Sequence, residues 1–339
     1  MQKINKQYKL LNMDTEIKKY LPRAEENVNL ANYSTFGIGG TARYFFNAKN
    51  KNEFKGAINA ALAAKIPFLI FGGASNTLIS DGNFPGLVIV IKGMPEEKDF
   101  APIETEKDCF IVEADAGWPL FFLTQSAGNN ALSGMEWAIG IPGTVGGAIN
   151  GNAGAYGEEM GNVVEEVEVM KIINGKSEEK KFSKADCEFG YRTSIFKKDA
   201  SLIILSARIK LKRGDAEKIK EEMKDRLSAR MAKHPKGFSA GSVFKNYSGS
   251  VDEEVIKKYP ELEQFVAKGT VPAAFLIDNC GLKGKSIGGA VISEEHANFI
   301  VNKGSASFAD VVSLINIIKE KVEKKYKIKL EEEIKYLLF

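Results

Sequence analysis

Cysteine and histidine are scarce in this chain, and their scarcity excludes several classes of protein. The 339 residues include two histidines and three cysteines, Cys109, Cys187 and Cys280. They form no Cys-x-x-Cys pair and no cysteine–histidine cluster, so neither a disulfide framework nor a zinc site is indicated. We interpret the cysteines as buried thiols in a reducing compartment and expect no bound metal.

Long apolar runs and an excess of one charge are also missing. Runs such as 87–91 are far shorter than the ~20 apolar residues of a membrane span. Residues 1–20 contain no apolar signal core. The 47 basic and 44 acidic residues leave a net charge of +3, too balanced to predict nucleic-acid binding. We therefore expect a cytoplasmic protein that binds neither membranes nor nucleic acid, and a monomer because no long apolar patch is evident.

Glycine, by contrast, is abundant and gathers in two loops. Residues 139–157 concentrate glycine among apolar residues, and such a bare backbone can approach a ligand closely. Consecutive free N–H groups in such a loop form an anion site suited to a pyrophosphate. No Gly-Lys-Ser/Thr follows, which excludes a Walker loop. With the glycine loop 72–77, this predicts an elongated diphosphate ligand such as a dinucleotide; two purely structural turns are the alternative.

Hydrophobic periodicity predicts helices mixed with strands, typical of an α+β protein. Asp215 should cap a long helix in which Ile219, Met223, Leu227 and Met231 recur every fourth residue. This helix is also a plausible connector between domains. Other helices are predicted over 52–65, 118–129, 273–279 and 308–326, and strands over 66–71, 87–92, 110–114, 164–173, 202–211, 287–292 and 299–301.

Two motifs carry residue types suited to catalysis. Arg192 follows a turn at Gly190, and its planar guanidinium suits a carboxylate or phosphate; a surface ion pair is the alternative. Ser242 lies among small residues, with Lys245 three positions further on. A nearby cation favours the alkoxide, so this serine could donate a proton or act as a nucleophile, or be an ordinary turn serine. No Gly-x-Ser-x-Gly elbow occurs, so a serine hydrolase is not indicated.

Other polar residues are less specific on their own. In a strand, Glu331 and Glu333 would share one face and Glu332 the other, and a solvated acidic edge is the alternative. His296 could line a site or be a satisfied structural histidine. Lys283 could contact phosphate or lie in a solvated loop.

In their order along the chain, these segments resemble the UDP-N-acetylenolpyruvoylglucosamine reductase (MurB) family, flavoenzymes of bacterial peptidoglycan precursor synthesis. Departures from the family pattern are Ala74 for a glycine, Tyr247 for a proline and Lys335 for an arginine. The short stretch between Arg192 and Ser242 resembles the second type of the family, which lacks an inserted loop bearing a substrate-contacting tyrosine. The similarity covers about residues 32–335 and rests on segments 33–40, 72–78, 141–157, 190–192, 240–246, 281–284, 287–290, 296–302 and 330–335.

The resemblance implies an α+β fold: a two-subdomain FAD-binding module of the p-cresol methylhydroxylase (PCMH) type, like vanillyl-alcohol oxidase, plus a smaller α/β substrate-binding domain. It implies an N-terminal extension over 1–27 and a first FAD subdomain over 28–94, joined by the C-terminal segment 328–339. The second FAD subdomain would span 95–214, and the substrate-binding domain 215–327.

The resemblance also implies non-covalent FAD, NADPH as co-substrate, and catalytic roles for Arg192, Ser242 and Glu333. Substrate contacts would come from Tyr156, Lys245, Asn246, Lys283 and His296. FAD contacts would come from Gly72, Gly73, Ala74, Ser75, Asn76, Thr77, Pro142, Gly143, Thr144, Gly146, Gly147, Asn152, Ala153 and Gly154.

The implied reaction reduces UDP-N-acetylglucosamine enolpyruvate to UDP-N-acetylmuramate. Hydride would pass from NADPH to flavin N5 and then to the enolpyruvyl group, before Ser242 protonates the carbanion. One alternative is a PCMH-type flavin oxidase of a small alcohol or phenol. Such enzymes often link flavin covalently through His or Tyr, and neither His234 nor His296 lies in a glycine loop. The other is a non-catalytic nucleotide-sugar binder.

Overall fold

The first layer of the molecule is a four-stranded sheet with the order β1-β2-β5-β3. The structure, a computed structural model, describes residues 17–339, so residues 1–16 of the expected N-terminal extension lie outside it. Strand β1 is antiparallel to β2, whereas β2 and β3 both run parallel to β5. The expected boundary between residues 27 and 28 falls within β1. The strands are β1 Glu25–Asn29, β2 Thr41–Ala48, β3 Phe68–Phe71 and β5 Asn83–Ile91.

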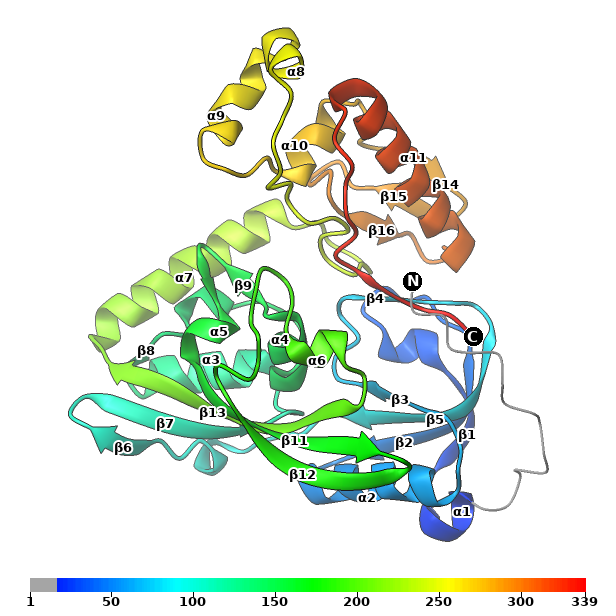
Figure 1. Ribbon diagram of the computed structural model, residues 1–339, viewed down its shortest axis with the longest axis vertical. Helices are drawn as coiled ribbons and strands as arrows, with labels where there is room; N and C mark the ends of the chain where they lie inside the picture. The colour runs from blue at the N-terminus through cyan, green and yellow to red at the C-terminus, as the bar shows by residue number, and fades with distance from the viewer. Residues whose placement is uncertain (1–16) are drawn as a thin grey trace.

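Helix α2, Lys51–Ala63, packs against β2 and β5 of this sheet. It begins where the Asn50 side chain accepts a hydrogen bond from the Glu53 backbone N–H, as expected of an N-cap. Its apolar residues, such as the buried Phe54, recur at helical spacing and face the sheet. The short helix α1, Ile17–Tyr20, lies beside α2 (Figure 1).

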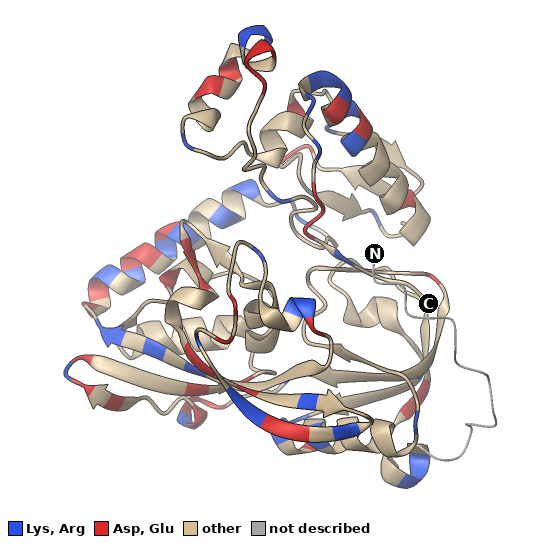
Figure 2. Cartoon of the chain, viewed as in Figure 1, with Lys and Arg blue, Asp and Glu red and all other residues tan. Residues whose placement is uncertain are grey.

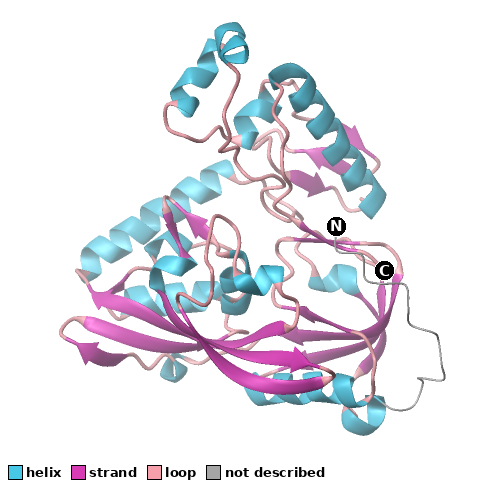
Figure 3. Ribbon diagram, viewed as in Figure 1, coloured by secondary structure: helices cyan, strands magenta, loops and turns pink. Residues whose placement is uncertain are grey.

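A second, six-stranded antiparallel sheet has the order β12-β11-β13-β7-β6, with β8 beside β13. One apolar core joins this sheet to the α2 face of the first. Figure 3 shows the strands of both sheets. Its strands are β6 Ile103–Glu106, β7 Cys109–Asp115, β8 Leu132–Ser133, β11 Val164–Ile173, β12 Lys176–Ser183 and β13 Leu202–Arg213. The connections contain α3 Leu120–Asn129, α4 Val145–Gly151, β9 Gly154–Ala155, β10 Glu158–Glu159, α5 Met160–Val163 and α6 Ile195–Lys198.

Helix α7, Ala216–Lys233, leads from the second sheet to the third part of the molecule. The Asp215 carboxylate caps it, accepting hydrogen bonds from two backbone N–H groups of the first turn, as predicted. Its row of apolar residues is only partly buried: Ile219 is in the core, whereas Met231 is exposed. Four residues turn an α-helix through about 400°, so an every-fourth row rotates away from the buried side. Charges of both signs cover the helix (Figure 2).

The third part is a three-stranded sheet, β14-β15-β16, covered by α11. The strand predicted over 287–292 is wrong, because Gly288 and Gly289 form a two-residue turn between β14 and β15. Gly288 has a φ of +51°, which such hairpin turns require. The elements are α8 Glu253–Lys258, α9 Glu263–Val266, α10 Ala273–Asp278, β14 Ser286–Ile287, β15 Ala290–Ile292, β16 Ile300–Asn302 and α11 Phe308–Tyr326.

The C-terminal segment returns to the first part of the molecule. Strand β17, Lys335–Leu337, pairs in parallel with β4, Thr77–Ile79 (Figure 1). This pairing brings the last residues of the chain against the end of the first glycine loop. The core of the third part in turn includes Phe36, Ile38 and Leu78, so the two regions share buried apolar surface.

The cysteines differ from the expectation of three buried thiols. All three are free, but only Cys187 is buried, whereas Cys109 and Cys280 are partly exposed. Cys109 begins β7 and Cys280 follows the end of α10, and residues at the ends of elements lie nearer the surface.

Membrane-spanning segments were searched within residues 17–339. None of the helices there combines the length and the apolar composition that crossing a membrane requires.

Candidate active site

The two glycine loops predicted to hold a cofactor lie against each other. Ser75 Oγ donates a hydrogen bond to the Pro142 carbonyl across 3.2 Å and 67 positions of sequence. A Cβ atom on Gly72 would collide with Thr144 Oγ1, and one on Gly73 would lie 2.8 Å from Gly143 Cα. Only glycine allows the backbones to approach so closely. A cradle of bare backbone is the arrangement that suits a diphosphate, so these loops fit FAD.

The remaining residues of the loops shape this cradle. Thr144 Oγ1 caps α4 by accepting from the Gly147 N–H at 3.3 Å. Gly146 packs against Ala116, where a Cβ would lie 2.8 Å from the alanine Cβ. Ala74 has a φ of +43°, a left-handed conformation that glycine adopts without strain. This geometry explains why the family pattern has glycine at that position.

Asn152 lies in the interior behind the loops. It has no exposed surface, and its φ is +44°. Its Oδ1 accepts from the Gly161 N–H and its Nδ2 donates to the Gly190 carbonyl, both at 2.9 Å. The side chain therefore supports the start of the turn that contains Arg192 rather than a ligand-facing surface.

Arg192 and Glu333 form an ion pair beside the loops. Nε of Arg192 lies 3.0 Å from Oε1 of Glu333, and the two side chains are only 22% and 19% exposed. Nη2 of Arg192 donates to the Gly154 carbonyl at 2.6 Å, which ties the pair to the second loop. Burial raises the pKa of Glu333, even though Arg192, Lys197 and Lys245 attract its charge. The site thus combines a fixed cation with a carboxyl group that holds its proton more tightly than usual.

The first loop contacts the Glu333 segment directly. Asn76 Nδ2 donates to the Glu333 carbonyl at 3.2 Å, and the Lys335 N–H donates to the Asn76 carbonyl at 2.9 Å. Thr77 pairs with Lys335 in the β4–β17 register. Asn76 of the predicted cofactor loop and the predicted catalytic Glu333 therefore lie side by side, just before the paired strands β4 and β17.

Ser242 enters the same region from the third part of the molecule. The neighbouring Val243 donates from its N–H to the Asn298 carbonyl and accepts from the Glu333 N–H, both at 2.8 Å. Ser242 itself stands opposite Phe299 in an antiparallel bridge. The segment is thus held between two others, and Ser242 lies one residue from the backbone partner of Glu333.

The predicted substrate residues divide into two sets. Lys245 pairs with Glu331, and Asn246 accepts from the Ala273 N–H at 3.2 Å. Both border a polar cavity of about 360 Å³, which Tyr191 and Lys329 also line. This first set lies next to the Arg192 turn.

The second set makes other contacts. Lys283 pairs with Asp278 at 2.7 Å, and the half-exposed Tyr156 lies over Arg226. The His296 ring packs against Phe299, and its Nδ1 accepts from the Asn298 N–H at 3.3 Å. His296 is therefore near the Ser242 segment through Phe299 and Asn298.

Comparison with known proteins identifies the family. Residues 42–179 match the model of an FAD binding domain, and residues 233–337 match the model of the UDP-N-acetylenolpyruvoylglucosamine reductase C-terminal domain. The curated UDP-N-acetylenolpyruvoylglucosamine reductases of Petrotoga mobilis and Fervidobacterium nodosum are each 40% identical over 310 residues. These alignments cover 91% of this chain and 93% and 90% of the relatives. The chain belongs to the UDP-N-acetylenolpyruvoylglucosamine reductase family.

A solved member of the reductase family has the same architecture. The crystal structure of UDP-N-acetylenolpyruvylglucosamine reductase (MurB) from Thermus caldophilus aligns with a TM-score of 0.70 and 32% identity. The alignment covers 93% of this chain and 99% of that one. Together with the FAD binding domain match, it confirms the predicted α+β, PCMH-type fold.

Sequence reasoning missed two partly buried lysines around the reductase site. Lys197 Nζ donates to the Arg192 carbonyl at 2.9 Å. With the Asn150 amide oriented so that its oxygen faces Lys335, Lys335 Nζ donates to that oxygen at 2.7 Å and the amide nitrogen donates to the Phe196 carbonyl. Burial, with the nearby charge of Lys197, lowers the pKa of Lys335 to about 8. In the sequence, Lys335 stands out only because it replaces an arginine of the family pattern, and nothing distinguishes Lys197 from the other lysines.

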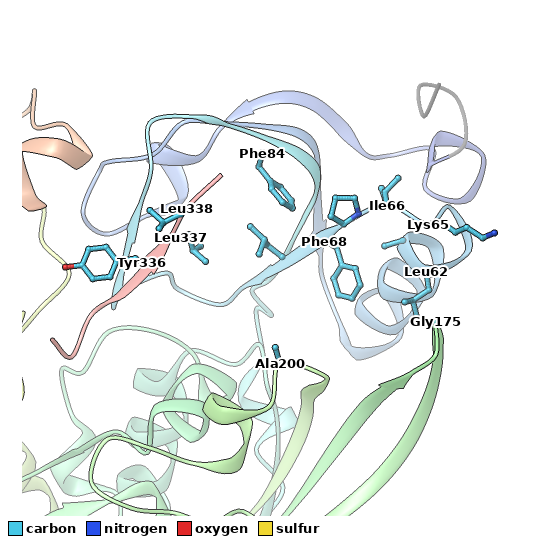
Figure 4. A pocket seen from close by; sticks show the side chains of 13 residues that line it. Leu62, Lys65, Ile66, Phe68, Phe84, Gly175, Ala200, Tyr336, Leu337 and Leu338 are labelled. Carbon is cyan, nitrogen blue, oxygen red and sulfur yellow. The ribbon is translucent and has the colours of Figure 1, made fainter. Parts of the chain in front are cut away.

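An apolar cavity of about 520 Å³ is lined by none of the predicted site residues of the reductase. Figure 4 shows the side chains that line it. Its walls come from the end of α2 and the connection to β3, from the first sheet, from the C-terminal segment with β17, and from two loops of the second sheet at Gly175 and Ala200. Tyr336 and Leu337 of β17 line it, three and four residues beyond Glu333. The strand that follows Glu333 thus continues into the cavity wall.

Proposed function

We propose that this protein is an FAD-dependent, NADPH-oxidising reductase that converts UDP-N-acetylglucosamine enolpyruvate to UDP-N-acetylmuramate in peptidoglycan precursor synthesis. The observation that carries the proposal is the partly buried Arg192–Glu333 pair, which contacts both glycine loops just before the C-terminal strand. FAD bound along these loops supplies the hydride carrier between NADPH and the substrate.

Arg192 stabilises the charge that develops on the substrate. An enolpyruvyl group that gains hydride at its terminal carbon carries negative charge on the next carbon, delocalised into the adjacent carboxylate. A fixed guanidinium opposes this charge without reorganising during the reaction. Burial raises the pKa of Glu333, so this group binds a proton more tightly than an exposed carboxyl group, and in its protonated form it can hydrogen-bond the developing oxygen.

Ser242 completes the addition by donating its hydroxyl proton to the carbon that carries the charge. A serine hydroxyl is fully protonated at neutral pH, so the donor is always in the required state. The serine oxygen is left as an alkoxide, and the nearby cation of Lys245 offsets part of its cost until solvent returns the proton. Hydride and proton together saturate the double bond.

The domain arrangement supports separate regions for binding the cofactor and the substrate. We propose that residues 28–94 with 328–339, and residues 95–214, bind FAD, whereas residues 215–327 bind the substrate. The proposal includes the predicted contacts with FAD and with the substrate. It also includes a monomeric state and a cytoplasmic location.

An anaerobic absorbance titration tests the function. One equivalent of NADPH should bleach the flavin band of the purified protein, and UDP-N-acetylglucosamine enolpyruvate should then restore it. A flavin that recovers only in air would indicate an oxidase. A colourless protein that still binds UDP would indicate a nucleotide-sugar binder.

A further inference from the structure

The backbone that carries Arg192 has an unusual conformation. Gly190 and Thr193 exchange backbone hydrogen bonds of 3.1 and 3.0 Å, so Tyr191 and Arg192 occupy a two-residue turn. Arg192 has a φ of +55°, where turns prefer glycine or asparagine. A side-chain-bearing residue stays in this left-handed region only when its surroundings hold it there.

Lys197 provides such a hold. Its Nζ donates to the Arg192 carbonyl at 2.9 Å from helix α6. The helix is itself anchored, because Phe196 is buried and the buried Ser194 donates from Oγ to the Asn150 carbonyl at 2.8 Å. A rigid element therefore presents the ammonium group to the carbonyl of a strained residue.

The charges around Lys197 are those of the reaction site. Its pKa is lowered, first by burial and then by Lys245 and Arg192, against the attraction of Glu333 and Glu331. A partly buried cation in this setting needs a strong acceptor, and the Arg192 carbonyl is one.

The next residue offers a contrast. Lys198 is 52% exposed and pairs with Glu188 at 2.8 Å, as surface lysines commonly do. Of the two neighbouring lysines of α6, Lys198 therefore forms a surface ion pair, whereas Lys197 contacts the Arg192 turn.

We propose that Lys197 is a positioning residue of the reductase. Its ammonium group holds the Arg192 carbonyl, which keeps the left-handed turn and so directs the guanidinium at Glu333. The inference rests on the proposed function, since it presumes that Arg192 acts on the substrate.

Lys197→Met in the FAD-loaded protein tests this role, with Lys198→Met as the matched control. Rapid-mixing absorbance measures flavin reduction by NADPH separately from flavin reoxidation by UDP-N-acetylglucosamine enolpyruvate. We expect Lys197→Met to slow reoxidation by about 10- to 100-fold, the effect of a misplaced reacting group, and to leave reduction unchanged. Lys198→Met should leave both rates unchanged, and Lys197→Arg should restore reoxidation because it keeps the charge and the donor.

The pH dependence provides a readout that a merely structural role would not move. The cations facing Glu333 are Arg192, Lys197 and Lys245. Removing one of them should raise the pKa of Glu333 and shift the pH profile of reoxidation upward in Lys197→Met, but not in Lys198→Met or Lys197→Arg.

Three results would overturn the proposal: reoxidation unchanged in Lys197→Met, equal losses in both half-reactions, or no rescue by arginine. If Lys197→Met does not fold, loss of reoxidation in Lys197→Arg with an unchanged melting temperature would count equally against it. Failure of the wild-type protein itself to be reoxidised by the substrate would instead refute the proposed function.

Discussion

Nε of Arg192 donates a hydrogen bond to Oε1 of Glu333 across 3.0 Å, although 141 positions separate the two residues in the sequence. The second arm of the guanidinium reaches the Gly154 carbonyl in the second glycine loop, and the Glu333 carbonyl accepts from Asn76 in the first. The pair therefore links both loops to the C-terminal strand, and changes at any of these positions should affect the others.

Ser242→Ala should slow flavin reoxidation by the enolpyruvyl substrate about 10²-fold or more, because it removes the proton donor. Flavin reduction by NADPH should be unchanged. Single-turnover absorbance under anaerobic conditions measures both steps, and Ser250→Ala, at an exposed serine eight residues further along, is the control. Intact reoxidation in Ser242→Ala would show that another group supplies the proton.

Arg192→Ala should slow reoxidation by about 10²- to 10³-fold, the usual effect of losing one group that stabilises developing charge. Arg192→Lys should react faster than Arg192→Ala but more slowly than the wild type. The planar guanidinium hydrogen-bonds Glu333 and the Gly154 carbonyl at the same time, and an ammonium group cannot reproduce this geometry. The two half-reactions are again measured separately. A similar loss of flavin reduction would indicate that Arg192 maintains the structure instead.

Glu333→Gln should change how stability depends on pH. Burial raises the pKa of Glu333 above its ordinary 4.5, so the native state binds this proton more tightly than the unfolded state does. The free energy of unfolding of the wild type, relative to Glu333→Gln, should therefore be highest below pH 4.5 and fall as pH rises through the native pKa. Urea unfolding at a series of pH values measures the difference. A difference that grows with pH would mean that attraction by Arg192, Lys197 and Lys245 outweighs burial.

Gly72→Ala should reduce the FAD content of the purified protein, because the added methyl group collides with Thr144 and separates the two loops. Gly151→Ala is the matched control: it lies at the end of α4, where a Cβ meets nothing within 4 Å. The ratio of flavin to protein absorbance measures the cofactor content. Equal FAD content in both variants would contradict the proposed diphosphate cradle.

Asn152→Ala should lower the free energy of unfolding by about 2–4 kcal/mol, since it leaves the Gly161 N–H and the Gly190 carbonyl without their partners. Asn152→Gly loses the same hydrogen bonds but tolerates the φ of +44°, and should be about 1 kcal/mol more stable than the alanine variant. Urea unfolding of both variants measures these differences. Equal stability of the two would show that the left-handed conformation costs alanine nothing here.

Local pattern predicted the longest helices and several strands, but not β1, β2 or β12. The strand over 164–173 and the helix over 308–326 have the predicted bounds, because side-chain periodicity within each segment is sufficient to define it. The Asp215 cap was predictable for the same reason. The errors have local causes too: a glycine pair divides 287–292 into a hairpin, and Met231 rotates out of the buried row of α7.

The sequence by itself determined which chemical groups this protein has: two glycine loops, one arginine in a turn, a serine near a lysine and a C-terminal glutamate, in the order of the reductase family. Only the tertiary structure decided which of them meet. Pairing of β17 with β4 brings Glu333 to the first loop, and the turn held by Lys197 brings Arg192 to Glu333. Such contacts depend on packing between distant segments, and the raised pKa of Glu333 depends on its burial there, so neither can be read from local composition.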